Sequence, residues 1–184
     1  TIKTFRLIVF LRCRMNGSQY EREFRSILEA DETLLEKITK SCSAVEKENY
    51  FRVVDKPFAV IRAAGSLGVD LVAVRGDISF LVEIKTSSAD TLHFSTMAGK
   101  LQQQAESMKA LCEKTLTLPL YAYRLKRHRG DSWRIFTVDH TTLQGRLRIL
   151  HQRLPLLDRS AKGNYIMRWD DGMPLSDFLD YLCK

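Results

Sequence analysis

Charged residues interrupt an apolar segment, residues 68–86, that reads GVDLVAVRGDISFLVEIKT. Glu83 and Lys85 are two positions apart, so in a strand their side chains point to the same face. Charged groups in so apolar a segment are costly unless they are paired or bind a metal. Two converging carboxylates, Asp70 and Glu83, repel each other, and a divalent cation removes that repulsion. With a lysine beside them to orient or activate water, these residues suit metal-assisted hydrolysis of a phosphodiester. The alternative is a structural ion-pair cluster around Lys85, which is disfavoured because buried ion pairs stabilise proteins weakly.

A β-hairpin would bring these residues together. The tight turn Arg75-Gly76-Asp77 joins two apolar runs, which predicts strands at about 69–74 and 78–86. Asp70 then lies beside Glu83 and Lys85 on the neighbouring strand. A short strand over 58–62 precedes the hairpin, and a helix capped by Ser95 or Thr96 follows it to about Lys114. The buried stripe expected on that helix is Met97, Leu101, Ala105, Met108 and Cys112.

The remaining chain adds helices and strands around this hairpin. Ser18 and Glu21 form a capping-box pattern at the start of a helix with a buried stripe to Leu28. Further helix and loop are expected over 31–56, strands over 120–125 and 133–138, and helices over about 141–153 and 175–183. This order predicts an α/β fold, with a mixed β-sheet flanked by helices. One domain is expected over 1–184, with its core at about 17–138 and a C-terminal extension at about 139–184.

Composition limits the class of protein. A chain of 184 residues with 45% hydrophobic residues is long enough to bury one substantial core, and no apolar run is long enough to span a membrane. The net charge of +7 favours a polyanionic partner, most often nucleic acid, although ribosome-adjacent and membrane-surface proteins share it. Four scattered cysteines, with no zinc-site spacing, predict reduced thiols and a cytoplasmic location.

Three blocks of the sequence match a known pattern. They are GSQYEREFRSIL at 17–28, AVIRAAGS at 59–66, and VDLVAV followed by LVEIK. In this order and spacing they resemble the archaeal-type Holliday junction resolvases of the PD-(D/E)xK nuclease superfamily, and the likeness continues more weakly to the end of the chain. The resemblance implies a restriction-endonuclease-like fold. Residues 31–56 look like an insertion relative to that family, and residues 1–16 precede its usual start.

The resemblance implies a catalytic set of Glu21, Asp70, Glu83 and Lys85. Asp70 and Glu83, with the backbone carbonyl of Ile84, would ligate Mg²⁺ or Mn²⁺, and Glu21 would be a further acid of the metal site. The other interpretation of Glu21 is a capping partner of Ser18. Gln102, Gln103 and Gln104 follow in the next helix, where superfamily members often keep a glutamine near the site, but the exposed face of an amphipathic helix is the favoured interpretation.

The candidate DNA contacts are basic or small. Arg22 and Arg62 resemble arginines at the rim of the family's active site, and Ser66 lies in a small-residue loop that could hydrogen-bond a phosphate. Ordinary surface charge and a turn residue are the alternatives. A basic hairpin offers a phosphate-binding platform, unless it is only a solvated tip, through Arg124, Lys126, Arg127 and Arg129.

Together these features predict a metal-dependent endonuclease that resolves four-way DNA junctions by paired symmetric nicks. Two symmetric cuts require two sites related by a two-fold axis, so a homodimer on branched DNA is expected, without a membrane or a small-molecule cofactor. The alternatives are another PD-(D/E)xK nuclease that acts on duplex or flap DNA, and a non-catalytic DNA-binding module.

Overall fold

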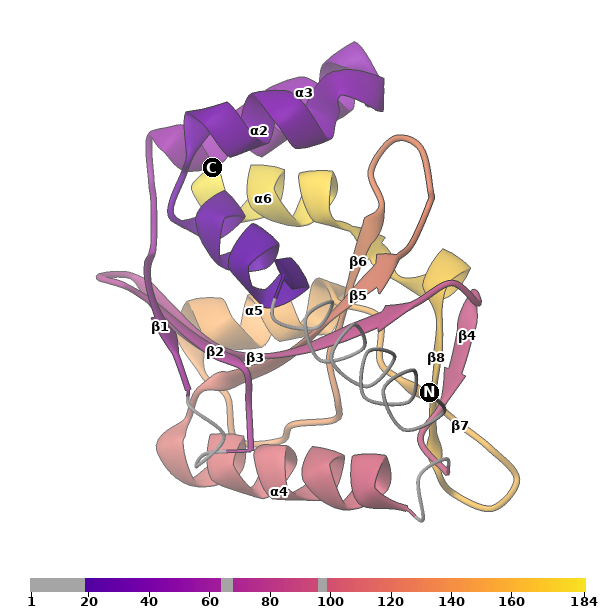
Figure 1. The fold of residues 1–184 in the computed structure, drawn as a ribbon. Coiled ribbons are helices and arrows are strands. Elements are labelled where there is room, and N and C mark those ends of the chain that lie inside the picture. The colour runs from indigo at the N-terminus through magenta and orange to yellow at the C-terminus, as the bar shows by residue number, and fades with distance from the viewer. Residues whose placement is uncertain (1–18, 64–67, 96–98) are drawn as a thin grey trace, which may run out of the picture.

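The computed structural model describes residues 19–63, 68–95 and 99–184. In these residues the main sheet has six strands in the order β1-β2-β3-β5-β6-β9 (Figure 1). The strands are β1 Ala59–Arg62, β2 Leu71–Arg75, β3 Ile78–Ser87, β5 Leu118–Leu125, β6 Trp133–Phe136 and β9 Met173–Pro174. β3 and β5 pair in parallel and the other neighbours pair antiparallel. The predicted mixed sheet flanked by helices is confirmed.

The β2–β3 hairpin is tight and strongly held. Arg75 pairs with Ile78 across the turn, which leaves Gly76 and Asp77 at its tip. The Arg75 guanidinium lies 2.6 Å from the Asp77 carboxylate and 4.3 Å from the Phe58 ring centroid. A two-residue loop fixes the register of a hairpin. The turn therefore determines which residues of β3 lie beside Asp70.

Helices cover both faces of the sheet (Figure 1). A helix over residues 19–28 (the 19–28 helix) lies on one side with α2 Glu32–Ile38, α3 Ala44–Phe51 and α6 Leu175–Cys183, and α4 Lys100–Thr115 lies on the other. The helices α2 and α3 fall in the predicted helical segment 31–56. The remaining helix is α5 Gly145–Arg153, and short 3₁₀ turns occupy η1 Thr39–Ser41, η2 Arg52–Val54 and η3 Trp169–Asp171.

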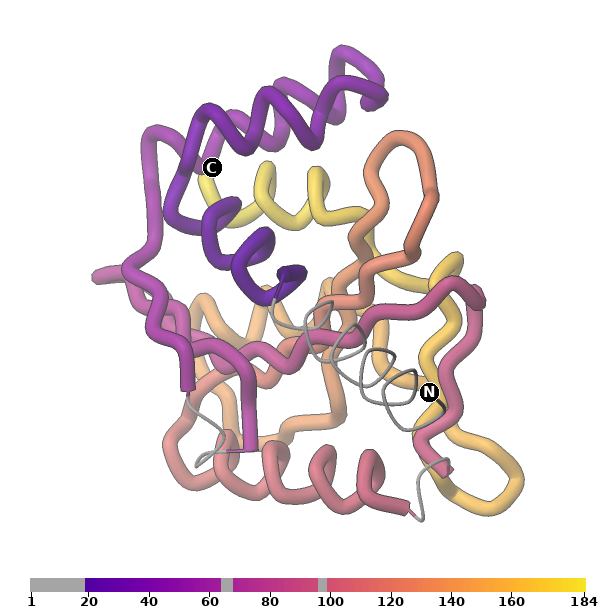
Figure 2. The backbone as a smooth tube through the Cα atoms, viewed as in Figure 1, coloured from indigo at the N-terminus to yellow at the C-terminus, as the bar shows by residue number. Residues whose placement is uncertain are grey.

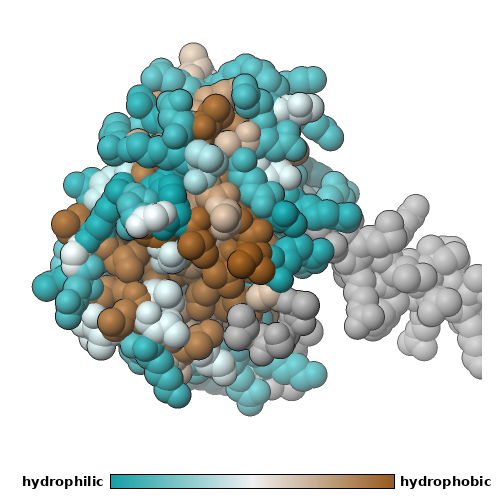
Figure 3. Space-filling view, turned by 90° about the vertical axis from the view of Figure 1, so that its left-hand side faces the viewer, coloured by the Kyte–Doolittle hydropathy of each residue, from teal (hydrophilic) through white to brown (hydrophobic). Residues whose placement is uncertain are grey.

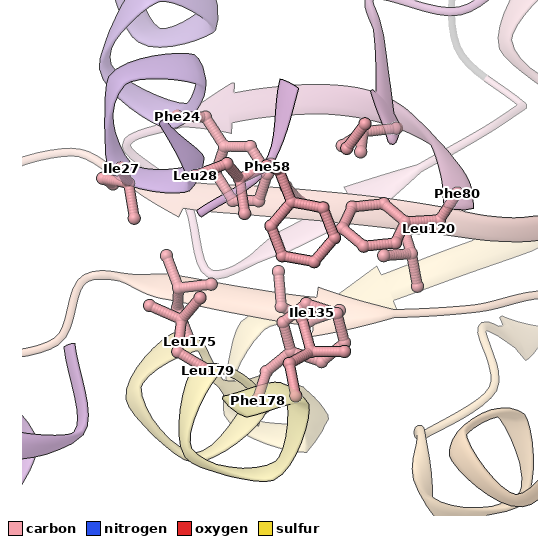
Figure 4. Close-up of a cluster of buried hydrophobic side chains, with 14 of the residues drawn as sticks. Phe24, Ile27, Leu28, Phe58, Phe80, Leu120, Ile135, Leu175, Phe178 and Leu179 are labelled. Atoms are coloured by element: carbon pink, nitrogen blue, oxygen red, sulfur yellow. The ribbon is translucent and has the colours of Figure 1, made fainter. Parts of the chain in front are cut away.

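The larger core lies between the sheet and the 19–28 helix and α6 (Figure 4). Phe24 and Leu28 from the 19–28 helix and Phe178 from α6 are fully buried in it. All three share this core with Phe58 and Phe80, and the ring centroids of Phe178 and Phe80 lie 6.1 Å apart, so the core anchors both helices to the sheet. The tube in Figure 2 shows how α6 returns the C-terminal end of the chain to the region of α3 and η2, with which it makes contact.

Helix α4 carries the predicted buried stripe, since Ala105, Met108 and Cys112 are buried against the sheet. Its start differs from the expectation. The helix begins at Lys100 after Gly99, whose φ of 75° is left-handed, whereas Ser95 lies in a turn. Thr96 and Met97 lie outside the described residues.

Three short strands that form a separate sheet were not expected. In the described part of the chain a second sheet has the order β4-β8-β7, formed by β4 Thr91–His93, β8 Tyr165–Arg168 and β7 Asp158–Arg159. Strands of this length carry too few residues to show a period of two. The predicted strand at 120–125 also begins earlier, at Leu118, and includes Pro119. Because β6 pairing ends at Phe136, opposite Tyr121, Pro119 breaks no hydrogen bond to that strand.

Apolar side chains reach the surface beside the β2–β3 hairpin (Figure 3). Ile61 and Val74 are 61% and 41% exposed. Register places Ile61 opposite Val72 and Ala59 opposite Val74, so these side chains share one face at the β1 edge of the sheet. Among the described helices, none is long and apolar enough to cross a membrane.

Candidate active site

Asp70 and β3 meet at one end of the hairpin. Asp70 directly precedes β2, and its backbone N–H donates to the Val82 carbonyl at 3.0 Å. The backbone N–H of Ile84 in turn donates to Asp70 Oδ2 at 2.7 Å. These bonds hold the Asp70 carboxylate against the stretch of β3 that carries Glu83 and Lys85.

Glu83 and Lys85 point to the same face of β3, as their spacing predicts. Lys85 Nζ donates to Glu83 Oε1 at 2.6 Å. Gln104 reaches the pair from α4: its Nε2 donates to Glu83 Oε1 at 2.8 Å and its Oε1 accepts from Lys85 at 3.2 Å. The interpretation of Gln102–Gln104 as an exposed face is therefore wrong for Gln104. The helical phase could have revealed this residue, because Gln104 lies one turn before the buried Met108.

The second oxygen of Glu83 differs from the first, which has two hydrogen-bond partners. Glu83 is 3% exposed, and its Oε2 is buried with no hydrogen bond from the described residues. A buried carboxylate oxygen left bare is costly, and such groups in native proteins call for an explanation. A cation ligand would satisfy this oxygen while leaving the Gln104 bond to Oε1 intact.

The site disfavours two negative charges. Burial raises the pKa of Glu83 to about 7, with the neighbouring Lys85 opposing the shift and Asp70 adding to it. Burial also raises the pKa of Asp70, opposed by the Ile84 N–H and increased by the charge of Glu21. Both pKa values are raised, which is the direction expected of carboxylates that lie close together in a desolvated site.

Glu21 approaches the site from the 19–28 helix. Its Oε2 accepts from Arg62 Nη2 at 2.5 Å, which joins the helix to the end of β1. The charge of Glu21 contributes to the raised pKa of Asp70, so the structure brings Glu21 near the carboxylates of the β2–β3 hairpin. Ser18, the partner required by the capping interpretation, lies outside the described residues. Arg22 is exposed on the same helix.

The donors present fit a hard divalent cation. In residues 19–63, 68–95 and 99–184 no three His, Cys, Asp or Glu side chains form a ready cluster for a metal. In the structure Lys85 pairs with one oxygen of Glu83, and Arg62 pairs with one oxygen of Glu21. Mg²⁺ prefers oxygen ligands and usually keeps several waters, so one or two carboxylates suffice. Asp70, Glu83 and the Ile84 carbonyl supply such a set.

The predicted DNA contacts separate into two kinds. Arg127 and Arg129 are exposed at the tip of the β5–β6 hairpin, and Lys126 is partly buried beside them. Arg124 instead bonds to Glu23 and lies over two aromatic rings. Ser66 lies outside the described residues.

Comparisons with known proteins indicate the family of this chain. A family model described as archaeal Holliday junction resolvase (Hjc) matches residues 37–183. Among solved structures, the chain is similar to Hjc of Archaeoglobus fulgidus, a Holliday junction resolvase from an archaeal hyperthermophile, with 20% identity, a TM-score of 0.46, and coverage of 66% of this chain and 81% of that one. No curated protein matches the sequence.

Proposed function

Because the chain belongs to the archaeal Holliday junction resolvase family, which its residues 37–183 match, we propose that it is a metal-dependent endonuclease that cuts four-way DNA junctions at paired, symmetric positions. One observation carries the metal dependence. Asp70, Glu83, Lys85 and Gln104 converge on one site in which a buried carboxylate oxygen has no hydrogen-bond partner among the described residues.

The acidic residues would hold the cation. Asp70 and Glu83 with the Ile84 carbonyl are the proposed ligands of Mg²⁺, or of Mn²⁺, and Glu21 is the proposed further acid. When bound, the ion supplies Lewis-acid activation of water and of the attacked phosphate. Gln104 fixes the orientation of Glu83 by donating to Oε1, which leaves Oε2 for the cation.

Lys85 has two possible partners in this scheme. In the structure its ammonium group donates to Glu83 Oε1 at 2.6 Å. With the carboxylates engaged, the same group can hydrogen-bond the attacking water or stabilise the negative charge that develops on the phosphate oxygens. Charge placed in advance where it develops in the transition state is usually the largest single contribution to catalysis.

Junction binding would rest on shape and phosphate contacts. The net charge of +7 and the exposed Arg127 and Arg129 favour a phosphate backbone. Arg22 and Arg62, close to Glu21, are the proposed contacts beside the scissile phosphate. Paired symmetric cuts need two sites, so we propose a homodimer. The exposed apolar side chains of Ile61 and Val74, near the site at the edge of the sheet, are the proposed surface for the second copy.

A cleavage panel tests the proposal. The protein is incubated with labelled four-way junction, flap and linear duplex, each in Mg²⁺ and in EDTA, and both strands are followed. We expect paired nicks in the junction only, dependent on Mg²⁺, and none from Asp70→Asn, which should still bind the junction with a Kd within about twofold of wild type. Preferred cutting of flap or duplex would assign a different nuclease substrate, and binding without cleavage would make the chain a DNA-binding module.

A further inference from the structure

The 19–28 helix carries two glutamates with different surroundings. Glu21 and Glu23 are two positions apart, which places them about 200° apart around a helix of 3.6 residues per turn. Glu21 therefore meets Arg62 at the end of β1, while Glu23 meets the β5–β6 hairpin. The side of the helix that carries Glu21 faces the candidate active site, and the side that carries Glu23 faces β5 and β6.

Glu23 is the centre of a partly buried network. Its Oε1 accepts from Arg124 Nε and from Trp133 Nε1, both at 2.9 Å. The side chains of Glu23 and Arg124 are only 14% and 18% exposed. Phe24 packs on the Trp133 ring with centroids 4.9 Å apart, so apolar contact and hydrogen bonding fix the same side of the helix.

Arg124 is turned inward. Its guanidinium lies 5.3 Å from the Tyr20 ring centroid and 5.8 Å from that of Trp133. Its Nη1 donates to the Leu125 carbonyl at 2.8 Å. An arginine with aromatic rings beside it and two of its nitrogens bonded to protein is poorly placed for a phosphate. It differs in this from Arg127 and Arg129 at the exposed tip.

The network also lies next to β3, the strand that carries Glu83 and Lys85. β5 runs parallel to β3, with Tyr123 opposite Lys85 and Arg124 opposite Thr86. Arg124 thus sits one position beyond Lys85 on the adjacent strand. A helix tied to this point has its distance and rotation set relative to Glu83 and Lys85.

We propose that Glu23, Arg124 and Trp133 are positioning residues that hold the 19–28 helix so that Glu21 completes the cation site. The inference rests on the proposed role of Glu21 and reassigns Arg124 from DNA contact to the support of that residue. Misplacement by about 1 Å, caused far from the reacting atoms, can cost about a hundredfold in rate. A defect in this network should therefore appear at the cation site before it appears in the fold.

Two conservative variants isolate the network. Arg124→Lys keeps a positive charge for any phosphate contact but loses the Nε–H that bonds Glu23. Trp133→Phe keeps the aromatic packing on Phe24 but loses the indole N–H. The matched control is Arg25→Lys on the same helix, whose side chain is 42% exposed and pairs with Glu29.

The readouts are Mn²⁺ affinity of the DNA-free protein, junction Kd in EDTA at several salt concentrations, and melting temperature. We expect Arg124→Lys and Trp133→Phe to bind Mn²⁺ about tenfold more weakly, the low end of the effect of losing a residue that orients a metal ligand. Junction Kd and its salt dependence should match wild type, and Arg25→Lys should match it in every readout. A weaker junction affinity of Arg124→Lys in EDTA would return Arg124 to the DNA-binding surface and overturn the proposal, because a lysine does not replace an arginine at a bidentate phosphate contact.

A double-mutant cycle with Glu21→Gln asks whether the network acts through Glu21. If it does, the double variant Glu21→Gln, Arg124→Lys should bind Mn²⁺ with the same affinity as the Glu21→Gln protein. The Glu21 carboxylate, which Arg124→Lys would misplace, is already absent from both proteins. Additive losses, or wild-type Mn²⁺ affinity in both folded single variants, would overturn the proposal. Failure of the proposed function is a separate result, because it appears as a wild-type protein that does not cleave or an Asp70→Asn protein that does.

Discussion

The bare, buried oxygen of Glu83 gives the sharpest test of the site. Glu83→Gln keeps the size of the side chain and can still accept from Lys85 and Gln104, but it cannot ionise. Burial raises the pKa of Glu83 from 4.5 to about 7. The folded state therefore favours the protonated acid, while the unfolded chain ionises at its ordinary pKa. The stability that this preference contributes is present below a pH of about 4.5 and is lost as pH rises through about 7.

The magnitude follows from the shift. One pKa unit corresponds to 1.36 kcal/mol, so the free energy of unfolding of the wild type should fall relative to Glu83→Gln by roughly 2 to 3 kcal/mol between pH of about 5 and about 8. For a chain of this length that is a relative change in melting temperature of roughly 4 to 12 °C. Any constant cost of the substitution cancels, because only the difference between the two pH values is used.

The assay is urea unfolding of both proteins in EDTA at the two pH values, with Glu48→Gln as control, since that side chain is 71% exposed. Adding Mg²⁺ at the higher pH should stabilise the wild type and leave Glu83→Gln unchanged, because a ligand stabilises only the state that binds it. A difference between the two proteins that does not vary with pH would refute the argument that burial holds Glu83 protonated.

Three further predictions concern Glu21, the β5–β6 hairpin tip and the exposed apolar residues at the edge of the sheet. Glu21→Gln should lower cleavage about a hundredfold with an unchanged melting temperature, by analogy with the loss of a metal-site partner, and full activity in the folded variant would leave only Asp70, Glu83 and Lys85 as the catalytic set. Replacing Arg127 and Arg129 together with Ala should flatten the log-log salt dependence of junction affinity by about one to two units, as measured by titration, and an unchanged slope would remove the hairpin tip from the DNA surface. The double variant Ile61→Ser, Val74→Ser should sediment as a monomer. The control Val45→Ser on α3, where Val45 is 68% exposed, should remain a dimer. A dimer in the double variant would place the interface elsewhere.

Local sequence signals predicted the hairpin and the last helix well. The Gly76-Asp77 turn and the apolar residues around it specify the β2–β3 register without help from the rest of the chain, and α6 spans Leu175–Cys183 as expected. Asp70, Glu83 and Lys85 were found for the same reason, because all three lie on this one hairpin. The mixed sheet followed from the order of elements.

Contacts between segments that are distant in the sequence could not be predicted from local sequence patterns. Glu23 and Arg124 are separated by 101 positions, and nothing in either segment distinguishes a helix anchor from a surface charge or a DNA contact. Gln104 was misjudged among three consecutive glutamines, although only one of them has the phase to meet β3. The strands of the small sheet, two to four residues long, are stabilised by pairing with one another and carry no signal of their own.

The ion pairs of Glu83 and Glu21 explain how the site can fold before it binds a metal ion. Each of two acidic residues has a resident cation, Lys85 for Glu83 and Arg62 for Glu21. Pairing lowers the cost of placing carboxylates close together in a partly buried site. A cation that took over these carboxylates would release one lysine and one arginine where the scissile phosphate is expected. Ion and DNA would then each raise the affinity of the other by the same factor, since such coupling is reciprocal. On this proposal the residues that pair with Glu83 and Glu21 in the structure, Lys85 and Arg62, would be the residues placed to contact the scissile phosphate.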